Sequence, residues 1–178
     1  MQAFDSLSRN IQQYIYDKGW PSLTRIQNAA IKQVANTDHN LILSAPTASG
    51  KTEAAFIPAL NSVEDWETGL KVLYISPLKA LINDQFQRIS ELSEYLDIPI
   101  TRWHGEVSQA QKRKVVNQPK GVLLITPESI EGMLVNRPGE AQHLFKGVEW
   151  IIIDELHSFL GTERGIHLQS LLQRISQF

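Results

Sequence analysis

Residues 40–56 read NLILSAPTASGKTEAAF, in which a short apolar run leads through small residues into a stretch of helical character. The N–H groups at a helix start have no intrahelical partner, and the helix dipole favours negative charge there. A turn from a buried strand into a helix, built from small residues, a lysine and a threonine, therefore suits a phosphate group.

The segment from Ala45 to Thr52 fits the P-loop pattern, with alanine in the place of the first glycine. In a P-loop the backbone N–H groups surround the phosphates, while Lys51 would reach the β and γ phosphates and the hydroxyl of Thr52 would bind Mg²⁺. An ordinary strand-to-helix turn without a ligand is the alternative. We expect the nucleotide-binding residues of this segment to be Ala45, Thr47, Ala48, Ser49, Gly50, Lys51 and Thr52.

The composition indicates one domain, since the chain has 178 residues of which 42% are hydrophobic. It has no cysteine, which excludes disulfides and thiolate metal sites. No long apolar run and no signal-peptide pattern is present, so we expect a soluble, cytoplasmic protein with no membrane partner. A net charge of −2 argues against a large basic surface, but backbone N–H groups can still hold a phosphate backbone.

Short apolar runs recur along the chain, and most are continuous rather than alternating, which is typical of strands buried on both faces. They begin at Leu41, Val72, Ile98, Val122 and Trp150. Between them the apolar residues change to a helical period. Strands and helices that alternate in this way predict an α/β fold, a three-layer sandwich with a central, mainly parallel sheet. Ligands of such sheets bind at the carboxyl ends of the strands.

The last apolar run ends in the sequence IIIDELH, residues 151–157. Asp154 at the end of a strand could hold Mg²⁺ through water, and Glu155 beside it could polarise an attacking water. The alternative is that both acids favour a helix start through capping and the helix dipole. Given the P-loop, we prefer the catalytic interpretation.

Two other expected strand ends resemble each other, with Ser76 before Pro77 and Thr126 before Pro127. Each pair predicts a helix N-cap followed by a proline at the first helical position. Capping explains this pattern without any function. The alternative is that the phosphates of a long polyanion lie along these helix starts, and the spacing does not decide between the two.

Several other polar residues have simple structural explanations. His104, beside Gly105 at the end of the third run, is more often structural than catalytic in such a position. Arg137 and Arg164 are expected to be single surface charges.

The segments APTASGKT, SPLKALINDQ, TPES and DELH, in this order, resemble motifs I, Ia, Ib and II of superfamily two helicases of the DEAD/DEAH-box type. GWPSLTRIQ is similar to the Q motif of the DEAD-box group, and DELHSFLGTERGIHL resembles the Lhr-type branch. The resemblance covers nearly the whole chain. It implies a RecA-like motor domain that binds ATP and Mg²⁺ and moves along a nucleic-acid strand, typically a single strand of DNA.

The resemblance also implies roles for single residues. Gln27 would read the adenine edge, with Arg25 in the same motif, and Phe4 would either stack on the base or anchor the core. The catalytic set would be Lys51, Asp154, Glu155 and His157, with Thr52 and Asp154 on the metal and His157 coupling the ATP site to the nucleic acid. The residues expected to line the nucleic-acid strand are Pro77, Lys79, Gly105, Thr126 and Pro127.

The chain departs from the family pattern at Ala48, where many relatives have glycine, and at Leu23, where the Q motif usually has proline. It also stops before motif III and the second motor domain. We therefore expect residues 1–178 to form one N-terminal motor domain, with a helical Q-motif region at 1–40 and a P-loop core at 41–178. We expect a monomer that is normally joined to a second RecA-like domain and is nearly inactive alone. A nucleotide-gated binding module without turnover and a small-molecule P-loop kinase remain the alternatives.

Overall fold

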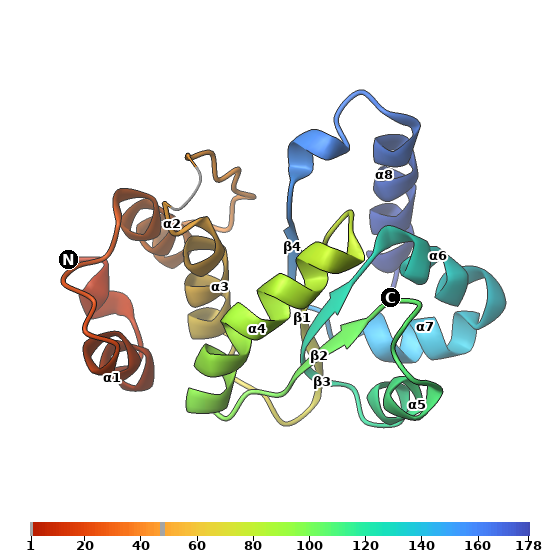
Figure 1. The fold of residues 1–178 in the computed structure, drawn as a ribbon, viewed down its shortest axis with the longest axis horizontal. Coiled ribbons are helices and arrows are strands. Elements are labelled where there is room, and N and C mark those ends of the chain that lie inside the picture. Colours follow the sequence, from red (N-terminus) through yellow and green to blue (C-terminus); the bar gives the residue numbers. More distant parts are fainter. Residues whose placement is uncertain (1, 47–48) are drawn as a thin grey trace. The chain divides into compact units, whose positions relative to one another are not determined.

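The computed structural model describes residues 2–46 and 49–178, and the chain divides into two units, Met1–Glu64 and Asp65–Phe178. Figure 1 shows the helices and strands of each unit in sequence colours. Among the described residues, no helix combines the length and the apolar character that crossing a membrane requires.

The first unit is helical. Its elements are η1 (Phe4–Ser6), α1 (Arg9–Asp17), α2 (Arg25–Asn36) and α3 (Lys51–Ser62). Two helix starts are capped by hydroxyl side chains, because Ser8 accepts a hydrogen bond from the N–H of Ile11 and Thr24 accepts one from the N–H of Gln27. The helices bury aliphatic and aromatic residues such as Ile11, Ile31 and Phe56.

The apolar run that begins at Leu41 is not a strand, although the sequence predicts one there. Residues 37–46 have neither helical nor strand structure, and Ile42 is 82% exposed. A strand needs a neighbouring strand to pair its backbone N–H and C=O groups. The described part of the first unit contains no other strand, so this run has no ladder partner within its unit.

The second unit is built on a parallel sheet with the strand order β2-β3-β1-β4. Its strands are β1 (Gly69–Ile75), β2 (Ile100–Trp103), β3 (Lys120–Ile125) and β4 (Trp150–Ile153). Four of the five apolar runs in the sequence thus become neighbouring parallel strands. Ile75 at the end of β1 pairs with Ile125 of β3 and with Ile153 of β4, so these three strands end at the same level.

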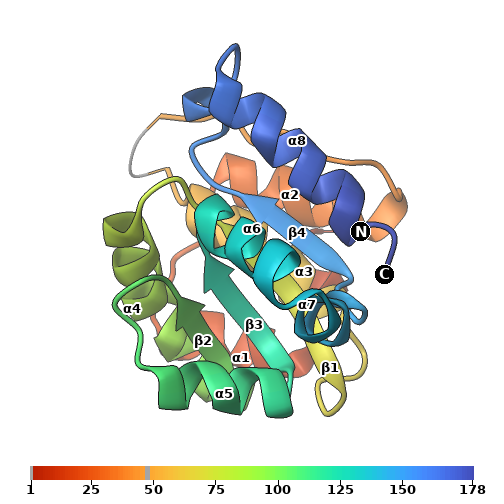
Figure 2. The same cartoon turned by 90° about the vertical axis from the view of Figure 1, so that its right-hand side faces the viewer.

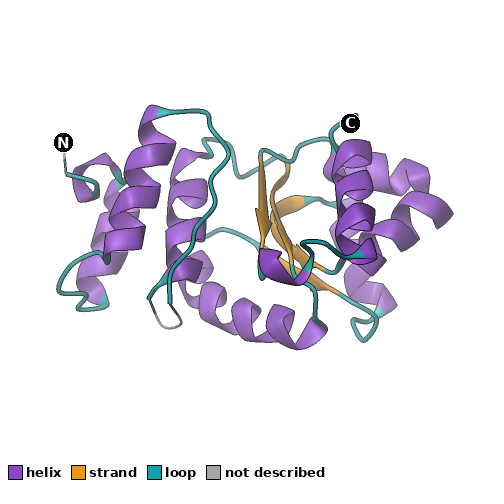
Figure 3. Ribbon diagram, turned by 90° about the horizontal axis from the view of Figure 1, so that it is seen from above, coloured by secondary structure: helices purple, strands orange, loops and turns teal. Residues whose placement is uncertain are grey.

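Helices cover both faces of this sheet, which confirms the predicted α/β sandwich for the second unit. They are α4 (Lys79–Tyr95), α5 (Gln109–Asn117), α6 (Pro127–Asn136), α7 (Pro138–Phe145) and α8 (Glu163–Ile175), and a short helix η2 (Leu156–Ser158) follows β4. Helix α4 lies on one side of the strands, and α6, α7 and α8 lie on the other (Figures 1 and 2). Figure 3 distinguishes the strands of the second unit, in orange, from its helices, in purple.

The core of the second unit lies between the sheet and helices α6, α7 and α8. Leu73, Ile75, Leu123 and Ile125 on the strands are fully buried there, and the helices contribute residues such as Ile130. Burying an aliphatic side chain of this size stabilises the fold by about 1.5–3 kcal/mol. The continuous apolar runs are therefore explained by helices on both faces of the sheet.

Gly121 permits a close approach at the start of β3. Its φ is +69°, and a Cβ atom there would lie 1.9 Å from the carbonyl oxygen of Pro99. That carbonyl accepts a hydrogen bond from the N–H of Val122. A side chain at position 121 would therefore break the contact that aligns β3 with the segment before β2.

Helices α6 and α8 are joined by a polar cluster around Glu131. Its Oε2 atom lies 3.0 Å from Nε2 of His167 and accepts a hydrogen bond of 2.9 Å from Arg174. The contact with His167 and that with Arg174 hold the pKa of the Glu131 carboxyl below its usual value. A depressed pKa contributes stability that is present above the unfolded-state pKa and is lost as pH falls through the folded-state pKa.

We predict that Glu131→Gln lowers the free energy of unfolding at neutral pH by about 0.5–1 kcal/mol, the value of a favourable exposed ion pair. The difference from the parent should disappear in acid, where the parent carboxyl is protonated as well. Thermal unfolding across a pH series measures both effects. Glu140→Gln serves as the control, because Glu140 only faces Arg137 at 3.5 Å on the surface of α7. A difference that stays constant from neutral to acid pH would contradict the assignment.

Candidate functional site

Polar residues follow the aligned ends of the strands in the second unit. Ser76, Thr126 and Asp154 come directly after Ile75, Ile125 and Ile153, which are paired with one another across the sheet. The backbone ladder continues one step further, because the N–H of Ser76 donates to Ile125 and the N–H of Asp154 donates to Ile75. The structure therefore brings the sequence motifs around residues 76, 126 and 154 to one edge of the sheet.

The expected phosphate loop belongs to the first unit, where Gly50 precedes α3 with a left-handed backbone at φ +82°. Lys51 is the first residue of α3, and its ammonium group donates to the carbonyl oxygens of Ala45 at 2.6 Å and Pro46 at 3.1 Å. The lysine thus lies across the loop from which it emerges. Thr47 and Ala48, which the sequence assigns to nucleotide binding, are outside the described residues.

The described part of this loop fits a phosphate group. No side chain among the described residues caps the N–H groups in the first turn of α3, so they remain available to an anion. The Oγ atom of Ser49 is buried and has no hydrogen-bond partner among the described residues. The Lys51 ammonium contacts the loop, and Thr52 is half-buried in the first turn of α3. These residues supply the N–H groups, the positive charge and the hydroxyl that the phosphates and metal of a nucleoside triphosphate require.

Gln27 is tied to the phosphate loop and is only 4% exposed. Its Oε1 atom accepts a hydrogen bond of 2.9 Å from the N–H of Thr24, and its Nε2 donates to the carbonyl of Gly50 at 3.4 Å. Gly50 has a φ of +82°, which favours glycine, and a Cβ atom there would lie 2.5 Å from that Nε2, so the Gln27 amide would have to shift. The motif around Gln27 and the loop around Gly50 therefore form one connected arrangement within the first unit.

The other residues assigned to the base lie near the surface. Phe4 is half-buried in η1, and Arg25 is exposed at the first position of α2. The carbonyl of Phe4 accepts a hydrogen bond from Gln12. Their contact with an adenine ring, like that of Gln27, stays a prediction.

Asp154 is held by two hydrogen bonds at the end of β4. Its Oδ2 accepts one from the hydroxyl of Tyr74, and its Oδ1 accepts one of 2.9 Å from the N–H of Glu155. Both oxygens of the carboxylate are thus oriented, and each keeps lone pairs for further ligands such as Mg²⁺-bound water. A carboxylate fixed at a strand end in this way suits a divalent cation.

Glu155 has a left-handed backbone, with φ 49° and ψ 42°, which non-glycine residues rarely adopt. Its carboxylate lies 3.3 Å from Nδ1 of His157 in η2, and both side chains reach solvent. The turn therefore presents the two other polar residues of the DELH segment just after the end of β4.

Tyr74 is a site residue that sequence reasoning missed. It lies in β1, is almost fully buried, and contacts Asp154 from the neighbouring strand. Burial first, and then the charge of Asp154, raise the pKa of the Tyr74 hydroxyl far above its usual value, so it remains a hydrogen-bond donor. A hydroxylated aromatic within the otherwise aliphatic run VLYI was the only signal in the sequence.

The two similar strand ends differ in the structure. Thr126 is the N-cap of α6, accepting a hydrogen bond of 3.3 Å from the N–H of Ser129, and Pro127 is the first helical residue, as predicted. The matching prediction for Ser76 and Pro77 is wrong, because α4 begins at Lys79 with Leu78 as its N-cap. Residues 76–78 are non-helical and connect the end of β1 to α4.

The remaining residues expected to line a nucleic-acid strand lie close to these ends. Lys79 is exposed and pairs with the carboxylate of Glu106, which adjoins the exposed Gly105. Contact with Lys79 holds the pKa of Glu106 below its usual value. His104 is buried and contacts Oδ1 of Asn83 at 3.2 Å, and burial lowers its pKa, which agrees with a structural role.

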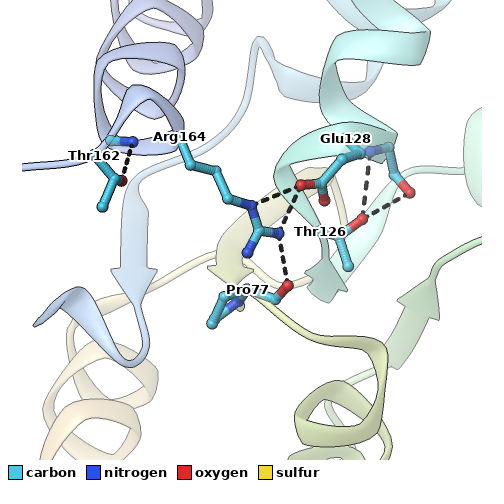
Figure 4. A network of polar contacts seen from close by, with 7 residues as sticks. Pro77, Thr126, Glu128, Thr162 and Arg164 are labelled. Carbon is cyan, nitrogen blue, oxygen red and sulfur yellow. Dashed lines mark hydrogen bonds and ion pairs between the residues drawn. The ribbon is translucent and has the colours of Figure 1, made fainter. Parts of the chain in front are cut away.

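Arg164 is not the isolated surface charge that the sequence predicts. From the first turn of α8 it donates two hydrogen bonds to Oε1 of Glu128, of 2.8 and 2.6 Å, and one of 2.6 Å to the carbonyl of Pro77 (Figure 4). It therefore joins the segment after β1 to the start of α6. Arg137 also has a partner, since it faces Glu140 on the surface.

Comparisons with known proteins match this geometry. Residues 24–178 match the family model described as DEAD/DEAH box helicase. The chain is 29% identical to the ATP-dependent helicase Lhr-Core of Methanocaldococcus jannaschii, over 99% of this chain and 22% of that protein. It is 35% identical to the Lhr helicase/uracil glycosylase of Escherichia coli, over 85% of this chain and 11% of that protein.

A solved structure with the same fold is that of Mycobacterium smegmatis helicase Lhr bound to ssDNA and AMP-PNP. It superposes with a TM-score of 0.86 at 29% identity, over 99% of this chain and 24% of that chain. The chain therefore spans less than a quarter of the length of the relatives named here.

We predict that Lys51→Ala removes triphosphate binding while leaving thermal stability nearly unchanged. The lysine contributes charge to the phosphates, and in the structure it contacts only loop carbonyls among the described residues. Titration with a fluorescent ATP analogue measures the affinity. Lys32→Ala, an exposed lysine on α2, is the matched control. Equal nucleotide affinity in Lys51→Ala and the parent would refute the phosphate loop.

We also predict that Tyr74→Phe reduces the gain in nucleotide affinity that Mg²⁺ provides, by about tenfold, as is common when a group that orients a metal ligand is removed. The variant keeps the ring in the core and deletes only the donor to Asp154. Nucleotide titrations with and without Mg²⁺ separate this effect from a loss of folding. Tyr95→Phe, on the surface of α4, is the control. If Mg²⁺ strengthens binding equally in the parent and in Tyr74→Phe, Tyr74 does not orient the metal ligand.

Proposed function

The chain belongs to the DEAD/DEAH box helicase family, and we propose that it is the ATP-binding motor domain of an ATP-dependent helicase. Its similarity to Lhr proteins from archaea and bacteria confirms the resemblance to the Lhr-like branch. The domain would couple ATP hydrolysis to movement along a single nucleic-acid strand or to its unwinding. The small-molecule kinase considered from the sequence belongs to a different family and is set aside.

One observation carries this proposal most strongly, namely the shared register of the strand ends in the second unit. Ile75, Ile125 and Ile153 are paired across the sheet, so Asp154 and the motifs around Pro77 and Thr126 emerge at one edge. Asp154 suits the metal of a nucleotide, and the helix start at Thr126 suits a phosphate of a strand. A motor requires these two kinds of ligand to be bound close to each other.

ATP would be bound by the phosphate loop and the Gln27 motif. Lys51 would leave the loop carbonyls and turn to the β and γ phosphates, while Gln27 and Phe4 would contact the base. Thr52 and Asp154 would hold Mg²⁺, which would neutralise charge on the phosphates. Support comes from the start of α3, where no side chain of the described residues caps the N–H groups, and from the orientation of the Asp154 carboxylate.

Glu155 would polarise the attacking water, and His157 would couple the ATP site to the nucleic acid. Glu155 has a left-handed backbone directly after β4, and its carboxylate lies 3.3 Å from Nδ1 of His157. A movement of His157 would therefore change the position of Glu155, which would polarise the attacking water. This coupling provides a route by which strand binding could stimulate hydrolysis.

The strand would run past Pro77, Lys79, Gly105, Thr126 and Pro127. DNA is favoured over RNA, because the Lhr structure that is similar to this chain is described as bound to ssDNA. A phosphate that approaches Lys79 must replace Glu106, its present partner. Since the other contacts come from backbone N–H groups and a hydroxyl, binding would depend little on base sequence.

The proposal includes the organisation of the protein. Residues 1–178 would form one motor domain that works as a monomer joined to a second RecA-like domain, in the cytoplasm. The greater length of the relatives supports further domains. A nucleotide-gated binding module without turnover would bind the same ligands, and a strand-stimulated ATPase assay on a protein with both motor domains distinguishes it.

We predict that Thr126→Val and Lys79→Ala each weaken binding of a labelled single strand by roughly three- to tenfold, without changing sequence preference, as loss of a phosphate contact should. Fluorescence anisotropy at low salt gives the affinity. Thr126→Ser should restore binding because it keeps the hydroxyl, and Lys114→Ala, an exposed lysine on α5, should have no effect. Affinity that depends strongly on base sequence, or that survives both changes, would contradict this strand path.

A further inference from the structure

The start of α6 presents an electrostatic conflict. Glu128 lies in the first turn of α6, where the helix dipole stabilises its negative charge. The same turn, capped by Thr126, is where the proposed function places a phosphate of the nucleic-acid strand. An unpaired carboxylate there would repel that phosphate.

Arg164 resolves this conflict through its contact with Glu128. Two guanidinium nitrogens, Nε and Nη2, donate to the single oxygen Oε1 of Glu128 at 2.8 and 2.6 Å (Figure 4). The pair is partly exposed, with 35% of the Arg164 side chain and 57% of the Glu128 side chain accessible. It is therefore near enough to solvent to face a ligand, while its charges cancel at the start of α6.

The same guanidinium also fixes a second strand end. Nη2 donates to the carbonyl of Pro77 at 2.6 Å, and Pro77 follows Ser76, whose N–H is bonded to Ile125. Arg164 thus contacts both segments that are proposed to line the strand, the one after β1 and the one after β3. This bond from a charged donor to a main-chain carbonyl is partly buried, and such charge-assisted bonds are stronger than bonds between neutral groups.

The position of Arg164 is set by the turn that follows the DELH segment. Thr162 caps α8, and a Cβ atom at Gly165 would lie 2.0 Å from the carbonyl oxygen of Phe159, so the first turn of α8 packs tightly on that residue. The guanidinium carbon of Arg164 lies 5.6 Å from the centre of the Phe159 ring. The turn after Asp154 and Glu155 therefore determines where the guanidinium is placed.

We propose that Arg164 is a positioning residue for nucleic-acid binding, which neutralises Glu128 and holds the carbonyl of Pro77 so that phosphates can bind at both strand ends. This inference rests on the proposed function. It assigns the arginine of the GTERG segment to the strand-binding surface, although the arginine need not touch the strand itself.

Arg164→Ala should weaken single-strand binding by roughly tenfold, a usual size for coupled neighbours, because it exposes the charge of Glu128 and frees Pro77. Glu128→Gln should leave binding close to that of the parent. The double variant Arg164→Ala/Glu128→Gln should recover most of the lost affinity, since the repelling charge is gone. Anisotropy titrations with a labelled oligothymidine strand measure all four proteins, and thermal unfolding shows that each is folded.

Arg174→Ala is the matched control for a purely structural role. Arg174 also lies on α8 and also pairs with a glutamate of α6, Glu131, at 2.9 Å. The Arg174→Ala variant should lower the free energy of unfolding about as much as Arg164→Ala and leave the affinity for the single strand unchanged. If both arginine variants weaken binding equally, Arg164 acts only by stabilising the fold and the inference is overturned.

The remaining outcomes separate the inference from the function on which it rests. A double variant as weak as Arg164→Ala would mean that the charge of Glu128 does not cause the loss of affinity, which overturns positioning through Glu128. Unchanged binding in Arg164→Ala, with weaker binding in Thr126→Val, would overturn the inference and leave the strand path intact. Absence of strand binding by the parent protein would overturn the proposed strand path and this inference together.

Discussion

The pairing of Ile75 with Ile125 on one side and Ile153 on the other determines where the polar residues of the second unit lie. In a parallel sheet all strands have their carboxyl ends at one edge, so residues far apart in the chain become neighbours there. Each strand can be short, because only its last residues need to be in register. The buried apolar runs supply the free energy that holds this register, and the residues after them supply the chemistry.

Much of the fold could be predicted from local patterns. Continuous apolar runs became four parallel strands, and Thr126 with Pro127 formed the expected cap and first helical position. These features depend on the residue and its immediate neighbours. The run at Leu41 and the helix start at Ser76 were predicted wrongly. Whether the run at Leu41 forms a strand depends on a hydrogen-bond partner elsewhere in the chain, which local sequence does not specify, and α4 begins only at Lys79.

The candidate site also contains residues that local sequence reveals and residues that depend on distant partners. The residues of the expected phosphate loop, Asp154 and Glu155 carry recognisable spacing, so the sequence alone proposes them as site residues. Tyr74 and Arg164 do not, because their partners are 80 and 87 residues away. A tyrosine in an apolar strand and an arginine in a helix are ordinary residues until the sheet brings Asp154 and Pro77 beside them. Such supporting residues became visible only once the strand register was known.

The left-handed backbone at Glu155 has a consequence for how this protein can change over evolution. A glutamate in that conformation costs about 1–2 kcal/mol relative to an ordinary one, and glycine would not carry this cost. The substitution that relieves the turn is therefore also the one that deletes the carboxylate. Under the role proposed for Glu155, a more stable turn and a carboxylate that polarises water require different residues at this position.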